Sequence, residues 1–350
     1  MNTEHWHYVQ GRPLSTGRLK AQNTDFIVRE RLGFEPSGDG EHVFLWIRKD
    51  GANTAWVAEQ LARFAKVHPR QVSFSGRKDK FAITEQWIGV HLPGKSEPDW
   101  QQASIEGVQI LKAVRHNKKL RTGIHKANDF ELVIRDISDP QDVEKRIALL
   151  SQGVPNYFGE QRFGRNNGNL HLGQRMLDGE QIRDRQKRSM AISALRAWLF
   201  NETISERITA GHFHRPLQGD IMILAGTHSF FCATEVDEDI EKRLQQRDIV
   251  LSAPLWGEGE LPNQGLAKDF EQRIAKRNQK LADGLAALGL KQERRALALY
   301  PENLEWRFED NHLHIRFTLP AGAFATAVVR ELLQVPQENQ MNNAATENKA

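Results

Sequence analysis

The strongest constraint on the fold is a strand pattern near the C-terminal end of the sequence. Between Leu313 and Leu319, apolar and polar side chains alternate at every position. This period is typical of a strand with one buried face. Pro320-Ala321-Gly322 then predicts a turn, and the apolar spacing that begins at Phe324 predicts a helix after it. A half-buried strand that runs directly into a helix indicates a fold in which sheets and helices pack together.

Strand and helix patterns also alternate through the rest of the chain. Further strands are expected at Thr24–Glu30, Val43–Ile47, Val72–Phe74, Gln86–His91 and Phe130–Ile134. Two helices are expected among them, one capped by Asn53 and one opened by Asp139-Pro140. This mixture predicts an α+β architecture.

Composition narrows the class of protein further. The chain has 350 residues, of which 39% are apolar and 27% charged, as in an ordinary globular protein with room for two domains. Cys232 is the one cysteine, so an internal disulfide is impossible and a reducing compartment is favoured. No signal-peptide pattern is present, and no apolar run approaches the roughly 20 residues of a membrane span. We therefore expect a cytoplasmic protein with no membrane partner.

Basic residues are concentrated in two segments. The segment 107–128 contains no acid, but it contains six Lys and Arg residues, Lys118 and Lys119 among them. A second cluster consists of Arg183, Arg185, Lys187 and Arg188. Because the net charge is only +3, this separation predicts a defined binding face for a polyanion. Solvated loops or helix faces are the alternative interpretation.

A single carboxylate among cations stands out as a candidate reactive group. Asp79 has Arg77, Lys78 and Lys80 around it, on a turn between two strand patterns. Nearby cations favour the ionised form of a carboxyl group. An ionised Asp suits a nucleophile or a base better than a proton donor. An Asp in a turn can also serve only the turn itself, which is the alternative.

Three other chemistries are less well supported by the residues. Gly89–Ser96 matches the P-loop pattern, but Pro98 disfavours the helix that must begin there. His212 and His214 form the closest histidine pair, and no second set of metal ligands accompanies them. Cys232 lies in an apolar strand pattern, where a cysteine is normally inert.

Separate motifs carry a resemblance to one known family. The pattern G-x-K-D-K-x-A-x-T-x-Q fits Gly76–Gln86, and N-Y-F-G-x-Q-R-F-G fits Asn156–Gly164. The pattern L-P-x-G-S-[FY]-A-T fits Leu319–Thr326, with Ala323 where Ser is usual. Lys20 and the segment Lys126–Phe130 also fit. From about Gly17 to Leu333, the sequence resembles the TruD family of tRNA pseudouridine synthases.

The resemblance implies an organisation into domains. It implies a split pseudouridine-synthase catalytic domain with a mixed or antiparallel sheet, formed by residues 1–155 and 305–336. An α/β domain specific to the TruD family, residues 156–304, would be inserted into it. The polar tail 337–350 has nothing to bury, so we expect disorder there. If the middle region is inserted, the strand from Leu313 to Leu319 must pair with a strand from before residue 150.

The resemblance also implies an activity and a site. Asp79 would be the nucleophile that isomerises a tRNA uridine, with uridine 13 in the D-arm as the family target, without a metal or organic cofactor. Substrate contacts would come from Lys20, Phe26, Lys78, Gln86, Asn128, Phe130 and Phe324. No obligatory protein partner is implied.

The residues themselves agree with that chemistry. A uridine must leave the stack before its base can react, and the extruded base needs aromatic and edge contacts. Phe26, Phe130 and Phe324 could stack on it, and the Asn128 amide could bind the uracil edge. A non-catalytic RNA-binding protein and a P-loop NTPase remain the alternatives, and the attacked atom, C6 or C1′, stays open.

Overall fold

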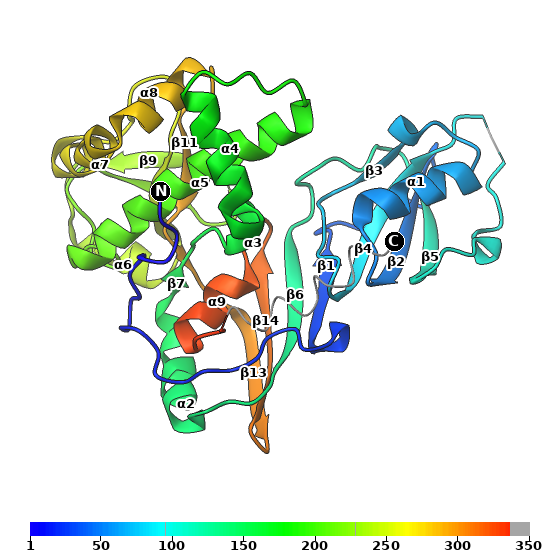
Figure 1. The fold of residues 1–350 in the computed structure, drawn as a ribbon, viewed down its shortest axis with the longest axis horizontal. Coiled ribbons are helices and arrows are strands. Elements are labelled where there is room, and N and C mark those ends of the chain that lie inside the picture. The colour runs from blue at the N-terminus through cyan, green and yellow to red at the C-terminus, as the bar shows by residue number, and fades with distance from the viewer. Residues whose placement is uncertain (95, 228, 337–350) are drawn as a thin grey trace. The chain divides into compact units, whose positions relative to one another are not determined.

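A computed structural model describes residues 1–94, 96–227 and 229–336 of the chain (Figure 1). Contacts between Cα atoms divide the chain into two compact units. Unit 1 consists of Met1–Arg12, Ala148–Tyr300 and Thr326–Glu331, and unit 2 consists of Pro13–Ile147, Pro301–Ala325 and the described residues from Leu332. The expected domain boundaries stay a prediction, and the expected disordered tail 337–350 lies outside the described residues.

Unit 2 is built on one eight-stranded sheet, with the order β13-β14-β6-β1-β4-β2-β5 and with β3 paired to β4. The pair β1–β4 is parallel and the other pairs are antiparallel, so the sheet is mixed. The strands are β1 (Phe26–Arg31), β2 (His42–Asp50), β3 (Val72–Phe74), β4 (Ile83–His91), β5 (Val108–His116), β6 (Ala127–Ile134), β13 (Glu302–Glu309) and β14 (His312–Pro320). The predicted α+β class is confirmed.

The pairing of β14 with β6 joins distant parts of the sequence. The two strands run antiparallel from the pair Leu313–Ile134 to the pair Pro320–Ala127. The expected return of the 313–319 strand to a strand from before residue 150 is therefore confirmed. The helix that follows, α9 (Ala325–Leu332), begins one residue after Phe324. Our placement of Phe324 inside the helix was wrong, because the turn at the end of β14 extends through Ala323, whose amide donates to the Pro320 carbonyl.

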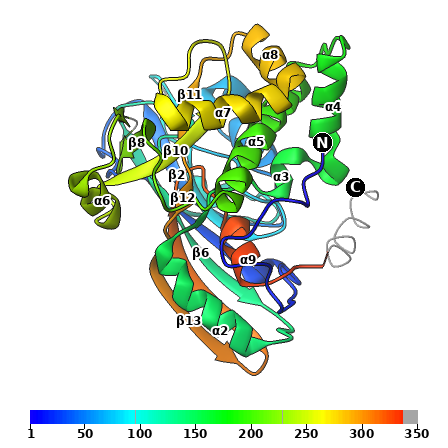
Figure 2. The same cartoon turned by 90° about the vertical axis from the view of Figure 1, so that its left-hand side faces the viewer.

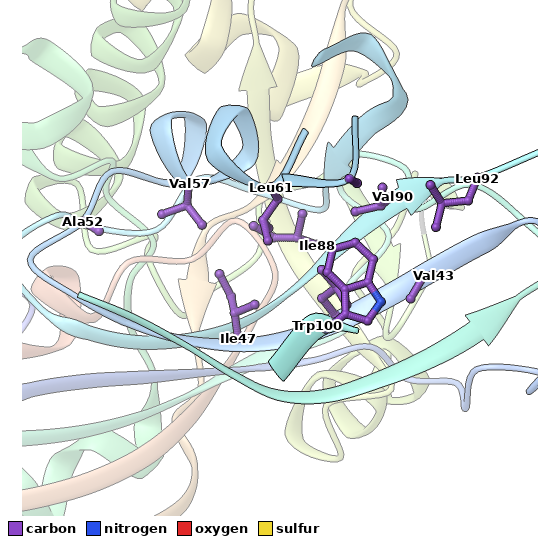
Figure 3. Packing of buried hydrophobic residues seen from close by; sticks show 11 residues of the cluster. Val43, Ile47, Ala52, Val57, Leu61, Ile88, Val90, Leu92 and Trp100 are labelled. Carbon is purple, nitrogen blue, oxygen red and sulfur yellow. The ribbon is translucent and has the colours of Figure 1, made fainter. Parts of the chain in front are cut away.

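Helix α1 (Thr54–Phe64) covers part of this sheet. Asn53 caps it as predicted, since the Asn53 side chain accepts a hydrogen bond from the amide of Ala55. Figure 3 shows Val57 and Leu61 directed toward the sheet residues Ile47 and Ile88. The other helical segments of unit 2 are α2 (Pro140–Leu149), η1 (Asn23–Asp25), η2 (Pro69–Gln71) and η3 (Trp100–Gln102).

Replacing Leu61 by Ala tests this core. Leu61 has no exposed surface, so the variant should lose roughly 2–5 kcal/mol of unfolding free energy through lost burial and a residual cavity. Urea unfolding measures the loss. The matched control is Leu14→Ala, because Leu14 is 76% exposed and its truncation should change stability by less than about 0.5 kcal/mol. Equal effects of the two changes would contradict the packing described here.

Unit 1 combines a four-stranded antiparallel sheet with helices (Figure 2). The sheet has the order β11-β10-β8-β9, and a short pair, β7 with β12, lies apart from it. These strands are β7 (Val154–Pro155), β8 (Asp220–Leu224), β9 (Phe230–Ala233), β10 (Ile249–Leu255), β11 (Glu293–Ala296) and β12 (Ala298–Leu299). The helices are α3 (Glu160–Phe163), α4 (Gly168–Leu177), α5 (Arg185–Thr209), α6 (Glu238–Gln245), α7 (Gly265–Arg277) and α8 (Gln279–Ala287), with η4 (Leu150–Gln152) and η5 (Arg165–Asn167). Residues Thr326–Glu331 of α9 also belong to this unit.

A buried ion pair joins the long helix of unit 1 to its sheet. Arg207 of α5 and Asp220 of β8 are both fully buried, and the Arg207 guanidinium donates two hydrogen bonds to the carboxylate, at 2.6 and 2.8 Å. The two parallel bonds satisfy both charges in the interior. The C-terminal end of α5 is thereby fixed to β8.

Candidate active site

The turn that carries Asp79 connects β3 to β4 in unit 2. Interior polar groups hold its backbone: the Gln86 amide donates to the Gly76 carbonyl at 3.1 Å. The backbone N–H of Lys78 donates to the Thr54 hydroxyl, also at 3.1 Å. The Thr54 hydroxyl donates in turn to the side-chain oxygen Oε1 of Gln86 at 3.0 Å. The sheet and the first residue of α1 together fix the conformation of the turn.

The carboxylate of Asp79 is fixed by Lys20. The Lys20 Nζ lies 2.6 Å from Asp79 Oδ2, and the Asp79 side chain keeps 32% of its surface exposed, against 16% for Lys20. The same ammonium lies 4.0 Å from the centre of the Phe26 ring. Lys20 has a φ of 57°, a left-handed backbone conformation that is uncommon outside glycine. The arrangement gives an oriented, accessible carboxylate with a cation beside it.

Lys49 lies beneath the same turn, and the sequence analysis missed it. It is fully buried, and its ammonium donates to the Asp79 carbonyl at 2.7 Å and to the Ala52 carbonyl at 2.9 Å. Burial lowers the pKa of Lys49 to about 8, although the Asp79 carboxylate acts to raise it. A signal was present in the sequence, because Lys49 continues the inward alternation of Val43, Leu45 and Ile47.

A second charged network begins at Glu30, whose side chain is fully buried. Lys78 Nζ lies 3.0 Å from Glu30 Oε2, and the Ser75 hydroxyl donates to the same oxygen at 2.5 Å. Lys78 also donates to Asn128 Oδ1 at 2.6 Å. Arg77 and Lys80 are exposed, whereas the Lys78 side chain points inward and is 7% exposed. The three cations of the turn therefore have different surroundings.

Asn128 is held from both ends of its amide. Its Nδ2 lies 3.4 Å from His125 Nε2, while its Oδ1 accepts from Lys78. Burial lowers the pKa of His125, and the charge of Lys78 lowers it further. When Asn128 Nδ2 donates to it, the neutral ring accepts at Nε2 and carries its proton at Nδ1. His125 is a second residue that the sequence analysis missed. It lies in the basic segment 107–128, where an exposed position is expected, but it is buried.

The aromatic residues expected to hold a base are mostly covered by protein. Phe26 is 3% and Phe130 is 7% exposed, and their rings meet edge to face with centroids 6.3 Å apart. Phe130 also packs against Phe317 of β14, at 5.5 Å. Since Lys20 contacts both Phe26 and Asp79, the aromatic pair lies at the edge of the same site. Phe324 is half-buried.

Comparison with known proteins decides the family. The sequence profile of the family "tRNA pseudouridine synthase D (TruD)" matches residues 2–183 and 180–332. This chain belongs to the tRNA pseudouridine synthase D family. The resemblance drawn from the motifs is confirmed.

Individual proteins of the TruD family are similar to this chain along most of its length. A tRNA pseudouridine synthase D of Pseudoalteromonas atlantica is 53% identical over 341 residues, which cover 96% of this chain and 97% of that protein. One of Shewanella oneidensis is 49% identical over 329 residues, covering 93% and 88%. A crystal structure described as tRNA pseudouridine synthase D from Methanosarcina mazei has a TM-score of 0.69 at 20% identity, covering 93% and 95%, and supports the fold.

The structure brings most of the residues predicted from the TruD motifs into one region of unit 2. Lys20 contacts Asp79, Lys78 contacts Asn128, and Phe26 contacts Phe130. Gln86 has no exposed surface, and both ends of its amide hold the turn from behind. The proximity of Phe324 to Asp79 stays a prediction.

The competing chemistries find little support in the described residues. After Gly94, residues 96–99 contain no helix, and the next helical segment is η3, so the P-loop match lacks the helix start it needs. Across 1–94, 96–227 and 229–336, no group of three or more His, Cys, Asp or Glu residues could hold a metal ion. In those same ranges, no helix has the length and apolar character needed to cross a membrane.

Proposed function

We propose that this chain isomerises uridine 13 in the D-arm of tRNA to pseudouridine, with Asp79 as the nucleophile. Its family makes it an enzyme of the tRNA pseudouridine synthase class, an isomerase that acts on tRNA. The observation that carries the finer proposal is the partly exposed Asp79 carboxylate, held by Lys20 on a turn fixed from within. The predicted substrate contacts remain part of this proposal for Lys20, Phe26, Lys78, Asn128, Phe130 and Phe324.

The reaction needs a nucleophile and rearranges bonds within one nucleotide. The N1–C1′ bond breaks, a C5–C1′ bond forms, and the proton lost from C5 is balanced by one gained at N1. An ionised carboxylate can attack uracil C6 or ribose C1′, and either route frees the base for rotation. The ammonium of Lys20 lies 2.6 Å from the Asp79 carboxylate and orients it for that attack.

The held amide of Asn128 supports selection of uracil. One Nδ2 hydrogen is directed to His125 and one Oδ1 lone pair to Lys78, which leaves one donor and one acceptor for a base. Uracil offers an acceptor and the N3–H donor on its edge, whereas cytosine offers the opposite order. An amide that cannot turn over therefore favours uracil. We assign Gln86 a positioning role behind the turn in place of the expected substrate contact.

The basic loop between β5 and β6 supports contact with tRNA phosphates. Lys118, Lys119 and Arg121 are exposed on it. The same loop reaches the catalytic turn, because the Gly123 amide donates to the Ser75 carbonyl at 2.6 Å. Cations would thus lie on a segment joined to the turn that carries Asp79.

Release of tritium tests the proposed reaction. A tRNA labelled with tritium at uridine C5 should lose the label when C5 bonds to C1′, in chelator and without ATP. A transcript with cytidine at position 13 should release none. Binding without release would favour the non-catalytic RNA-binding alternative, and a requirement for ATP would favour the NTPase. Release that persists in the position-13 variant would exclude this target.

The salt dependence of tRNA binding tests whether the loop between β5 and β6 contacts tRNA phosphates. Charge reversal of Lys118 and Lys119 together should flatten the slope of log K against log salt by between about 1 and 2, because fewer counterions are released on binding. The matched control is Lys145→Glu, an exposed lysine on α2. Filter binding at several salt concentrations gives both slopes. An unchanged slope in the double variant would exclude the loop from the footprint.

A further inference from the structure

Lys49 is a buried cation with no role in the bond rearrangement proposed above. Lysine is almost never fully buried without a charged partner, yet Lys49 has no exposed surface. In the described part of the chain, no carboxylate lies within salt-bridge distance of it. Its Nζ donates instead to the Asp79 carbonyl at 2.7 Å and to the Ala52 carbonyl at 2.9 Å. A buried ammonium held by carbonyl dipoles is costly to the fold, and a functional role would account for that cost.

The two carbonyls explain what this ammonium fixes. Ala52 belongs to the connection between β2 and α1, and Asp79 belongs to the turn between β3 and β4. The bond to Asp79 is made to its main chain, whereas Lys20 contacts its carboxylate. Two ammonium groups therefore hold Asp79, one at each end of the residue.

We infer that Lys49 is a positioning residue for the reaction, which fixes the main chain of Asp79 and keeps a positive charge beneath its carboxylate. The inference rests on the proposed role of Asp79 as nucleophile. Lys49 acts through Asp79 and touches no substrate. A displacement of about 1 Å at a reacting group can lower a rate roughly 100-fold, so the clamp on the main chain matters for turnover.

The charge of Lys49 gives the inference a pH dependence. Two charged groups act on it: the Asp79 carboxylate raises its pKa, and Lys78 lowers it, while burial has the largest effect and brings the pKa to about 8. Lys49 is therefore charged near neutral pH and loses its charge as the pH rises through about 8. The rate of the chemical step should fall over the same interval.

Stability should change in the opposite direction. The pKa of Lys49 is lower in the folded protein than its ordinary value of 10.5, so the unfolded chain binds this proton more tightly. Between about pH 8 and that value, the Lys49 contribution to the unfolding free energy rises with pH. A rate that falls while this contribution rises separates a site effect from unfolding.

Two variants of Lys49 separate the effect of its charge from the effect of its hydrogen bonds, and a third variant is the control. Lys49→Gln keeps a donor but removes the charge, and its single-turnover rate should fall roughly 100-fold with tRNA affinity unchanged. Lys49→Arg keeps the charge at all accessible pH values and should remove the decline near pH 8. Lys145→Met, at the exposed lysine on α2, is the matched control and should behave as wild type.

Single-turnover tritium release between about pH 7 and pH 9.5, with unfolding monitored alongside, decides the inference. A wild-type rate that stays constant over this range overturns it, whether or not the variants fold. A folded Lys49→Gln variant with the wild-type rate and pH profile also overturns it. Failure of the proposed function looks different, because wild type then forms no pseudouridine or Asp79→Asn remains active.

Discussion

Replacing Asp79 by Asn abolishes pseudouridine formation and leaves tRNA binding nearly intact. The Asn side chain keeps the size of Asp and its place on the turn, but an amide cannot form the bond that the proposed mechanism requires. Lys20 loses the anion that lies 2.6 Å from it and can only become more attractive to RNA phosphates. The variant therefore loses pseudouridine formation but keeps the surface that binds tRNA.

The experiment measures two quantities on the same tRNA. Single-turnover tritium release should fall at least about 100-fold, a loss typical of removing a covalent nucleophile. The dissociation constant should stay within about threefold of wild type. Asp39→Asn is the matched control, because Asp39 is an exposed aspartate in a loop of the same unit. Residual turnover above a hundredth of the wild-type rate would sink the nucleophile assignment.

The fold and the central residue of the site could be predicted because both leave local signals. Alternation along Leu313–Leu319 predicted the strand. The split domain implied by the family resemblance predicted its return to a strand from before residue 150, and the structure shows that this strand is β6. The cations around Asp79 are its sequence neighbours, so the charged turn was evident. By contrast, the start of α9 depended on how far a turn extends, which local spacing does not determine.

The supporting residues were harder to predict because their partners lie far away in sequence. Lys49 reaches the Asp79 carbonyl, and Glu30 reaches Lys78. The inward alternation of β2 placed Lys49 in the core, but no sequence pattern names the carbonyls it meets. Gln86 was also hard to interpret from sequence. Its place in a motif does not say whether its side chain faces the substrate or supports the turn.

Loss of Lys78 should affect stability and uridine selection separately. Lys78→Met leaves the Glu30 carboxylate buried without its cation, and breaking a buried pair from one side costs about 3–5 kcal/mol. The double variant Glu30→Gln/Lys78→Met removes both charges and should recover most of that loss, since the Ser75 hydroxyl can still donate to the Gln carbonyl oxygen. Lys291→Met breaks an exposed pair with Glu258 and should leave the unfolding free energy nearly unchanged.

The recovered double variant then tests the held amide of Asn128. Without Lys78, the Asn128 Oδ1 loses its 2.6 Å contact, and the remaining contact with His125 can be reversed by a change of the His125 tautomer, so the amide can turn over. Cytosine edges can then be accepted as well as uracil edges. A tRNA with cytidine at position 13 should therefore compete with substrate tRNA more strongly against the double variant than against wild type. Unchanged competition in a stable double variant would show that Lys78 does not orient the amide. A double variant as unstable as Lys78→Met would instead show that the Glu30 charge was not the source of the lost stability.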